Sequence, residues 1–307
     1  MKRKRVLIIW NIASGVGEAR QKLPDMIAEL SLAGCEVLSC PIVPAKGLDS
    51  KDILQHYTKD TLDILVVSGG DGTMNHVVNA MRELGLDLPV VYFSTGSTND
   101  FARSLGITNR VKDLCQAALH GQEFLYDLGL FNEQYYNYVA AFGAFTSISY
   151  KTNQDIKNVL GYAAYVLNGV LSAPESLSSR QHLRILHDGT SEEGDYIYGS
   201  VSNALSVGGM KPWMLSGTRM DDGFFEVMLI KAPDNINDVA AIVQTLALEQ
   251  NDSAIRSSQY IHLFRTKEIQ FISGAGIDWT IDGEYGGRQK DVRIRVVKKG
   301  MRLLVKK

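Results

Sequence analysis

The sequence predicts an α/β protein with an N-terminal doubly wound parallel α/β domain and a C-terminal, mostly antiparallel β-sandwich domain. Strand-like and helix-like segments alternate over the first third of the 307 residues, and short β-rich runs dominate after residue 121. A chain of this length also exceeds what one hydrophobic core usually supports. We therefore expect a first domain over residues 1–122, to which a last strand near 298–307 could return, and a second domain over 123–297.

The first domain is predicted from four apolar runs typical of buried strands, at 6–10, 36–43, 62–67 and 88–93. Helices are expected where apolar residues recur at helical spacing, around 23–30, 51–57 and 74–84. Such alternation produces parallel strands with helices on both faces. The loops that follow the strands then meet at one edge of the sheet.

The second domain is predicted from shorter β-rich runs, which favour antiparallel pairing. They lie at 135–141, 183–187, 196–201, 224–230, 260–264, 268–272 and 291–297. Two helical segments, near 157–171 and 236–249, interrupt these runs. No linker rich in proline or serine separates the two parts, so we expect the domains to pack closely.

Composition excludes several classes of protein. With 45% hydrophobic residues, 21% charged residues and a formal net charge of -2, the chain is an ordinary globular protein with little support for nucleic-acid binding. Cys35, Cys40 and Cys115 are irregularly spaced, which favours reduced thiols over disulfides or zinc ligands. The apolar stretch at 159–173 is too short and broken to span a bilayer. We expect a cytoplasmic protein without a signal peptide.

Basic residues cluster at both ends of the chain, at 1–5 and 288–307. Such clusters favour an anionic surface, and we expect any membrane contact to be peripheral, at the inner face. Solvated ends of edge strands explain the same residues without a membrane.

The sharpest local signal is Ser-Gly-Gly-Asp-Gly-Thr-Met-Asn at 68–75, where a predicted strand runs into glycines and then a helix. Glycine lets backbone N–H groups approach a phosphate, and the helix N-terminus adds positive partial charge. The carboxylate of Asp71 suits such a loop if Mg²⁺ lies between it and the phosphates. A tight turn capped by Thr73 explains the same residues without a ligand. Two further loops of small residues, at 11–17 and 94–100, favour a nucleotide site.

Five motifs occur in order along the chain. They are GGDGT with Asn75, GSTNDFA at 96–102, YDLG at 126–129, DDGFFEV at 221–227 and DGE at 282–284. Together they resemble the diacylglycerol kinase catalytic-domain family, which includes bacterial lipid kinases, sphingosine kinases and ceramide kinases. The resemblance implies a kinase that uses ATP and Mg²⁺ to phosphorylate a lipid hydroxyl, foremost that of diacylglycerol, giving phosphatidic acid.

The resemblance also implies roles for single residues. Glu284 would be the general base, and Asp71 and Asp282 would take part in catalysis. The nucleotide would be bound by Asn11, Ser14, Gly15, Gly69, Gly70, Asp71, Gly72, Thr73, Asn75, Gly96 and Ser97. The base must reach the acceptor hydroxyl, so the active site is expected in the cleft between the domains. Without the family, Asp-Gly-Glu at 282–284, followed by two glycines, favours a hairpin turn with solvated acids.

The remaining acids have two interpretations each. Asp100 and Asp127 would join the catalytic acids in a water-linked network, yet Asp100 also suits a helix N-cap and Asp127 an ordinary turn. Asp222 would hold a structural Mg²⁺ together with the backbone carbonyls of Arg219 and Phe224. A plain Asp-Gly turn explains Asp222 without a metal.

Departures from the family pattern keep alternatives open. Ile12 replaces a proline, Val16 a lysine, and Val43 lies where the family often has a threonine that faces the nucleotide. A catalytically silent lipid- or nucleotide-binding regulator is therefore one alternative. An NAD kinase is another, because that related fold also uses a GGDGT loop. The acceptor lipid is not identified by the sequence; residues 161–171 could line an acyl-chain pocket, and a homodimer is compatible with the resemblance.

Overall fold

The computed structural model describes residues 3–12, 14–43, 46–96, 99–143, 180–204, 217–247 and 258–306. The chain divides into two compact units, Met1–Leu128 with Lys298–Lys307, and Gly129–Val297. β5 (Gln122–Phe131) and β13 (Glu284–Val305) each contribute residues to both units. The domain boundary expected after residue 122 stays a prediction. The segments expected at 157–171 and 161–171 lie outside the described residues.

The first unit contains a parallel sheet in the order β2-β1-β3-β4. Its strands are β1 (Arg5–Asn11), β2 (Glu36–Ile42), β3 (Ile64–Gly69) and β4 (Val90–Ser94). The end of β13 extends this sheet, with Leu303 parallel to Val90. β3 and β4 are buried along their whole length, since both faces of a parallel sheet are covered.

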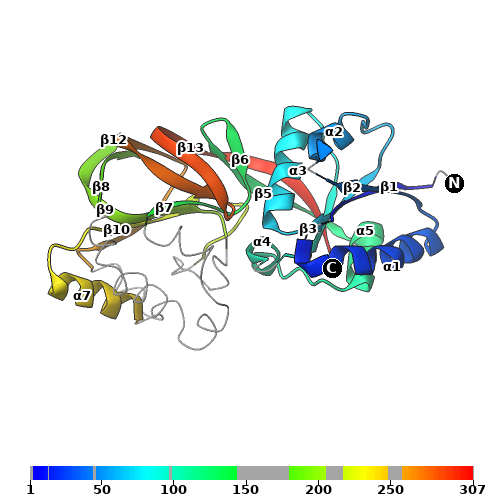
Figure 1. The fold of residues 1–307 in the computed structure, drawn as a ribbon, viewed down its shortest axis with the longest axis horizontal. Helices are drawn as coiled ribbons and strands as arrows, with labels where there is room; N and C mark the ends of the chain where they lie inside the picture. The colour runs from blue at the N-terminus through cyan, green and yellow to red at the C-terminus, as the bar shows by residue number, and fades with distance from the viewer. Residues whose placement is uncertain are drawn as a thin grey trace. The chain divides into compact units, whose positions relative to one another are not determined.

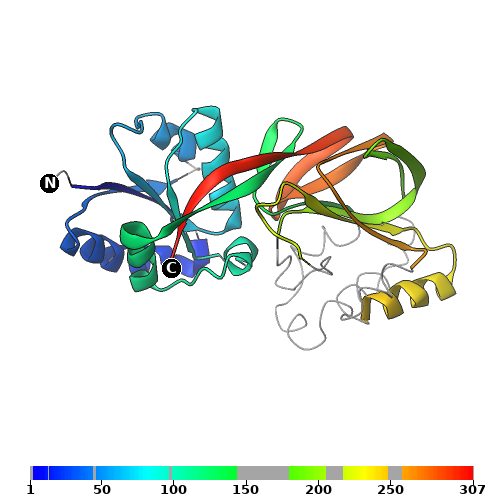
Figure 2. The same cartoon turned by 180° about the vertical axis from the view of Figure 1, so that it is seen from behind.

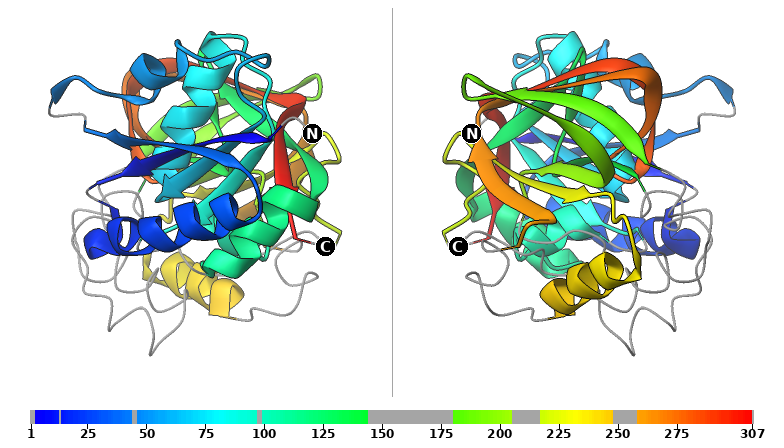
Figure 3. Two further views of the ribbon diagram at one scale, coloured as in Figure 1. Left: turned by 90° about the vertical axis from the view of Figure 1, so that its right-hand side faces the viewer. Right: turned by 90° about the vertical axis from the view of Figure 1, so that its left-hand side faces the viewer.

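Helices cover both faces of this sheet (Figure 1; Figure 3, left). They are η1 (Ser14–Gly17), α1 (Glu18–Leu32), α2 (Ser50–Leu54), α3 (Asp71–Glu83), α4 (Asp100–Ser104) and α5 (Val111–His120). α1 packs against α5 and α2 against α3. The sequence-based expectations contain α4 only as the helix that Asp100 could cap, and they do not contain α5. The buried face of α5 consists of Leu114, Cys115, Ala117 and Ala118.

The second unit is built from antiparallel strands (Figure 2). They are β6 (Gln134–Tyr136), β7 (Val139–Gly143), β8 (Gln181–His187), β9 (Thr190–Ser202), β10 (Phe225–Lys231), β11 (Ile261–Thr266) and β12 (Glu268–Ile281). β9 and β12 are long because each pairs with β8 along one part and with β7 along another. The single run expected at 135–141 is two strands.

Aromatic rings form the centre of the second unit. The ring of Trp279 lies edge-on to Phe131, Phe142 and Phe271, with centroid distances of 5.1, 4.9 and 5.2 Å. Edge-to-face pairs of this kind contribute about 0.5–1.5 kcal/mol each beyond the area that they bury. This cluster anchors β12, the strand that leads into the turn before Glu284.

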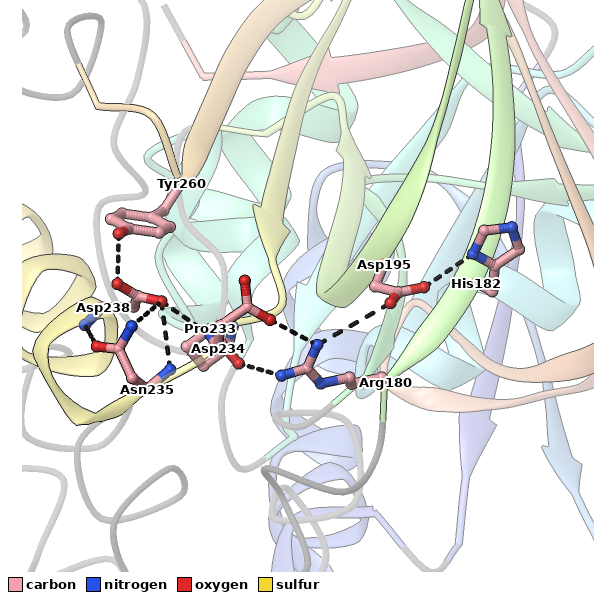
Figure 4. A network of polar contacts seen from close by, with 8 residues as sticks. All are labelled: Arg180, His182, Asp195, Pro233, Asp234, Asn235, Asp238 and Tyr260. Atoms are coloured by element: carbon pink, nitrogen blue, oxygen red, sulfur yellow. Dashed lines mark hydrogen bonds and ion pairs between the residues drawn. The ribbon is translucent and has the colours of Figure 1, made fainter.

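Polar contacts fix the start of α7 (Ile236–Ala247), which matches the helix expected near 236–249 as far as the described residues extend. Asp238 accepts the backbone N–H of Asp234 at 2.8 Å and the phenol of Tyr260 at 2.6 Å (Figure 4). Arg180 in turn donates to Asp234 Oδ1 at 2.9 Å. These hydrogen bonds therefore hold the start of α7 to the residues that immediately precede strands β8 and β11. No helix among the described residues is long and apolar enough to cross a membrane.

Candidate functional site

The glycine-rich loop joins β3 directly to α3. Gly69 ends the strand, Gly70 is the N-cap in extended conformation, and the helix begins at Asp71. A Cβ on Gly69 would lie 2.5 Å from the Cβ of Thr73, so this position requires glycine. Thr73 lies inside the first turn, and its Oγ1 accepts the side-chain N–H of Asn11 at 3.0 Å. The interpretation of Thr73 as the cap of the turn is therefore wrong.

The loops after β3 and β4 pack backbone against backbone. A Cβ on Gly96 would lie 2.7 Å from the Cα of Gly70. The backbone N–H of Thr95 donates to Gly69 O at 2.8 Å. Asn99 braces the second loop, because its Oδ1 accepts the N–H of Gly96 at 2.8 Å and its Nδ2 donates to Gly96 O at 2.7 Å. Two glycine backbones thus stand side by side at the start of α3, where a phosphate could approach N–H groups.

The loop after β1 joins the other two. Besides the contact of Asn11 with Thr73, Ser14 Oγ donates to Thr95 O at 3.3 Å and accepts Thr95 Oγ1–H at 3.2 Å. Gly15 lies within η1, between this loop and α1. The three loops predicted to meet at one edge of the sheet are in contact. Ser97 lies outside the described residues.

Asp71 and Asp100 lie together at the centre of these loops. Asp71 is 8% exposed; its Oδ2 accepts the backbone N–H of Asp100 at 2.8 Å and its Oδ1 accepts the phenol of Tyr92 at 3.2 Å. The N-cap of α4 is Asn99, with φ of 53°, and Asp100 is the first helical residue. The interpretation of Asp100 as an N-cap is therefore wrong. Asn75 is also buried, one turn into α3.

Asp127 occupies the middle of β5 and not a turn, so its interpretation as an ordinary turn acid is wrong. Its carboxylate is 1% exposed and accepts the backbone N–H of Lys299 at 2.7 Å. Both residues belong to the first unit. Asp127 therefore holds β5 against β13, and its part in a network of acids stays a prediction.

The motif DGE forms the turn between β12 and β13. Ile281 pairs with Glu284, and the two turn residues Asp282 and Gly283 have φ of 48° and 86°. Positive φ at both central positions is the signature of a type I′ hairpin turn, for which Asp-Gly is a preferred pair. The interpretation as a hairpin turn is confirmed. Glu284 is exposed immediately after this turn.

Asp282 is not a solvated turn acid, contrary to the interpretation of the turn from sequence. It is 2% exposed, and its carboxylate accepts the backbone N–H and the Nδ2–H of Asn137 at 2.6 and 2.9 Å. It also accepts the N–H of Tyr138 at 2.9 Å and that of Val139 at 3.2 Å. These donors lie where the chain passes from β6 to β7. Asp282 therefore provides hydrogen-bond acceptors for buried backbone N–H groups at this interruption between the two strands.

Asp222 forms a local turn in which its Oδ1 accepts the N–H of Phe224 at 3.0 Å. The side chain of Arg219 pairs with both carboxylate oxygens of Asp221, at 2.9 and 3.0 Å. Among the described residues, no three or more His, Cys, Asp or Glu side chains are grouped to hold a metal ion. A Mg²⁺ site made of Asp222 and backbone carbonyls stays a prediction.

A buried acid near this turn was not singled out by the sequence. Glu226 on β10 is 5% exposed and accepts Arg265 Nε–H at 3.0 Å and Thr218 Oγ1–H at 2.8 Å. Burial raises the pKa of Glu226, and this outweighs the opposing effects of Thr218 and Arg265. The motif DDGFFEV contains this glutamate, but only the pairing of β10 with β11 places it beside Arg265.

Tyr92 is the other residue at the site that sequence reasoning missed. It lies in β4 within an uninterrupted apolar run, where periodicity indicates only burial. Its contact with Asp71 depends on the parallel pairing of β3 with β4. Thr95, the partner of Ser14, lies in the loop at 94–100 that the sequence singled out, but it was not named as a site residue.

Curated proteins and solved structures resemble this chain over nearly its whole length. Diacylglycerol kinases of Staphylococcus aureus strains MRSA252 and bovine RF122 / ET3-1 are 28% identical to it over 286 residues, which is 93% of this chain and 88% of theirs. The crystal structure of a diacylglycerol kinase from Bacillus anthracis str. Sterne superposes with a TM-score of 0.74 at 17% identity, covering 99% of this chain and 98% of that one. Another Bacillus anthracis structure reaches a TM-score of 0.80 at 19% identity and the same coverage.

These structural likenesses confirm the predicted fold class, an N-terminal region of alternating strands and helices with parallel pairing and a C-terminal, mostly antiparallel β region. Residues 5–131 match the family described as Diacylglycerol kinase catalytic domain. That match contains all three loops that meet around Asp71, and the curated relatives extend the similarity through the second unit. Over residues 5–131 the chain is therefore similar to diacylglycerol kinase catalytic domains, and over 93% of its length it resembles curated diacylglycerol kinases.

Proposed function

We propose that this chain is an ATP- and Mg²⁺-dependent lipid kinase that transfers the γ-phosphate to the hydroxyl of diacylglycerol and produces phosphatidic acid. The observation that carries the proposal is the meeting of three loops around the buried carboxylate of Asp71. Curated relatives described as diacylglycerol kinases, at 28% identity, support the choice of acceptor. The family supports the use of ATP.

The loops of the first unit suit a nucleotide. The backbones of Gly70 and Gly96 lie so close that a Cβ would clash, and they adjoin the N-terminus of α3. These two glycine backbones and the N-terminus of α3 together form a cradle for the phosphates. Polar side chains lie beside this cradle, namely those of Asn11, Ser14 and Thr73. Backbone N–H groups at a helix N-terminus bind phosphate oxygens well.

The chemistry of the donors also suits Mg²⁺. Mg²⁺ in kinases is held by one or two carboxylates together with phosphate oxygens and water, and not by a cage of protein ligands. Asp71 would supply such a carboxylate, with Asp100 beside it. The ion would offset the charge on the phosphates during transfer. The role of this chain is to hold that carboxylate in a fixed place.

The second unit would supply the general base. We assign this role to Glu284, which would take the proton of the acceptor hydroxyl as the hydroxyl oxygen attacks the γ-phosphorus and ADP leaves. Asp282 would orient the turn that carries Glu284, since four hydrogen bonds hold its carboxylate. We further propose a cytoplasmic protein that reaches its lipid peripherally at the inner membrane face, with a homodimer as the assembly.

The test is transfer of labelled phosphate from ATP to diacylglycerol in mixed micelles with Mg²⁺. Sphingosine, ceramide, monoacylglycerol and NAD serve as parallel acceptors. We expect labelled phosphatidic acid from the wild type and at least about a hundredfold slower transfer from Glu284→Gln. The matched control is Glu133→Gln, which removes another exposed carboxylate from a turn of the second unit and leaves the rate unchanged.

Each other outcome points to a different function. Label on NAD alone replaces the lipid kinase by an NAD kinase. Label on sphingosine, ceramide or monoacylglycerol retains the kinase and changes its substrate. Bound ATP without transfer to any acceptor favours a lipid- or nucleotide-binding regulator. Equal rates for wild type and Glu284→Gln remove Glu284 from the role of base.

A further inference from the structure

Tyr92 directs its phenol at the candidate magnesium carboxylate. The side chain lies in β4, is 2% exposed and packs on Phe101 with a centroid distance of 5.9 Å. Its hydroxyl oxygen is 3.2 Å from Asp71 Oδ1 and 3.3 Å from Gly69 O. Both of these oxygens can only accept a hydrogen bond, so the phenol is the donor in either contact.

A phenol has one proton, and two features favour its donation to Asp71. Gly69 O already accepts the backbone N–H of Thr95 at 2.8 Å. The Asp71 carboxylate, when ionised, is also the stronger acceptor, because charge-assisted hydrogen bonds are roughly twice as strong as neutral ones. The hydroxyl of Tyr92 therefore donates its proton to Asp71 in preference to Gly69 O.

The carboxylate of Asp71 is then held from two sides. Tyr92, from β4, donates to Oδ1, and the backbone N–H of Asp100, from the start of α4, donates to Oδ2 at 2.8 Å. An ionised carboxylate has about four acceptor positions. A donor on each oxygen fixes the plane of the group and therefore the direction of the acceptor positions that remain.

We infer that Tyr92 is a positioning residue, which orients the Asp71 carboxylate for the Mg²⁺ of Mg·ATP. The inference rests on the proposed function, since it requires ATP at the three loops. Mg²⁺ demands near-ideal octahedral geometry, so a carboxylate that serves it, directly or through water, must have a fixed orientation. Groups that hydrogen-bond such a carboxylate tune the binding of the metal without touching it.

The test is calorimetric binding of ATP to the full chain, over a series of Mg²⁺ concentrations and in EDTA. Tyr92→Phe keeps the buried ring and removes only the hydroxyl. We expect its apparent Mg²⁺ constant to rise about tenfold, with unchanged ATP affinity in EDTA. Tyr57→Phe is the matched control, because it removes a phenol that contacts Cys40 in the same unit, and we expect it to bind like the wild type.

A second measurement separates positioning from packing. If Tyr92 acts through Asp71, adding Tyr92→Phe to Asp71→Asn changes the Mg²⁺ dependence of binding no further. An unchanged Mg²⁺ constant in Tyr92→Phe overturns the inference. So does a loss of ATP affinity that is equal with and without Mg²⁺, or a further loss in the Asp71→Asn background.

The outcomes also separate this inference from the proposed function. Mg²⁺-dependent ATP binding that weakens in Tyr92→Phe, without phosphate transfer to any lipid, retains the inference and contradicts the lipid kinase. Lipid phosphorylation by the wild type with the same Mg²⁺ dependence in Tyr92→Phe retains the kinase and contradicts the inference. In an active kinase we expect the variant to lose kcat at limiting Mg²⁺, regain it at saturating Mg²⁺ and keep its KM for the lipid.

Discussion

The carboxylate of Asp282 accepts both the backbone N–H and the side-chain N–H of Asn137, at 2.6 and 2.9 Å, across 145 positions of sequence. The turn between β12 and β13 is therefore hydrogen-bonded to the residues that separate β6 from β7. The first acid of the DGE motif is buried in this contact, while Glu284, two positions later, is exposed. Two neighbouring acids in one motif thus have different physical roles.

Asp282→Ala should destabilise the second unit strongly. The substitution leaves the N–H groups of Asn137, Tyr138 and Val139 without their acceptor, and hydrogen bonds to a charged group contribute about 1.5–3 kcal/mol each. We expect the free energy of unfolding in urea to fall by about 3 kcal/mol or more. Glu284→Ala is the control, with an expected change within about 0.5 kcal/mol because Glu284 is exposed. Similar losses in the two variants would contradict the assignment.

Gly96→Ala should weaken ATP binding, because the new methyl group would lie 2.7 Å from the Cα of Gly70. A backbone atom cannot rotate away, so the loops after β3 and β4 must separate. We expect at least about a tenfold loss of ATP affinity by calorimetry, since the cradle for the phosphates opens. Gly274→Ala is the control, because nothing lies within 4 Å of its added methyl group. Wild-type affinity in Gly96→Ala would show that the phosphates do not use this cradle.

Glu226→Gln should change how stability depends on pH. Burial raises the pKa of Glu226 above its ordinary value of 4.5, so the folded state binds this proton more tightly than the unfolded state. In the wild type, this group lowers the free energy of unfolding as pH rises from about 4.5 through the folded-state pKa. Glutamine does not titrate, so the variant lacks this loss, and its stability relative to wild type increases with pH.

Urea denaturation between about pH 4 and pH 8 tests this prediction. Glu268→Gln is the matched control, since this exposed glutamate also pairs with an arginine, Arg293. A constant difference between Glu226→Gln and the wild type across that range would refute a raised pKa at Glu226.

The three cysteines should differ in reactivity. Burial raises the pKa of Cys115 to about 11 and raises the pKa of Cys35, while the thiolate is the form that reacts. Cys40 is only half-buried, on the edge strand β2. We expect iodoacetamide at neutral pH to alkylate Cys40 in the native protein and to reach the other two only in denaturant. Mass spectrometry of peptides measures this, and native labelling of Cys115 at the rate of Cys40 would contradict it.

The alternation of strands and helices in the first unit follows from the sequence because it depends on local periodicity. β1, β3 and α3 each appear where their apolar period predicts them. The glycines of the loop at 68–75 are equally local, since their need for close approach is a property of the backbone. β5 continues beyond Asp127, where the sequence suggested the end of a strand-like segment, because the buried carboxylate is satisfied by a distant backbone N–H. α5 was not predicted.

The sequence by itself determined the class of fold, the positions of the three loops and the order of the family motifs, because short-range pattern and glycine sterics carry that information. Only the tertiary structure decided what each acid contacts. Asp71 meets Tyr92 across 21 positions, Asp282 meets Asn137 across 145 and Asp127 meets Lys299 across 172. Strand pairing and burial determine these partners, because a buried carboxylate is hydrogen-bonded to whichever donors the tertiary structure places next to it.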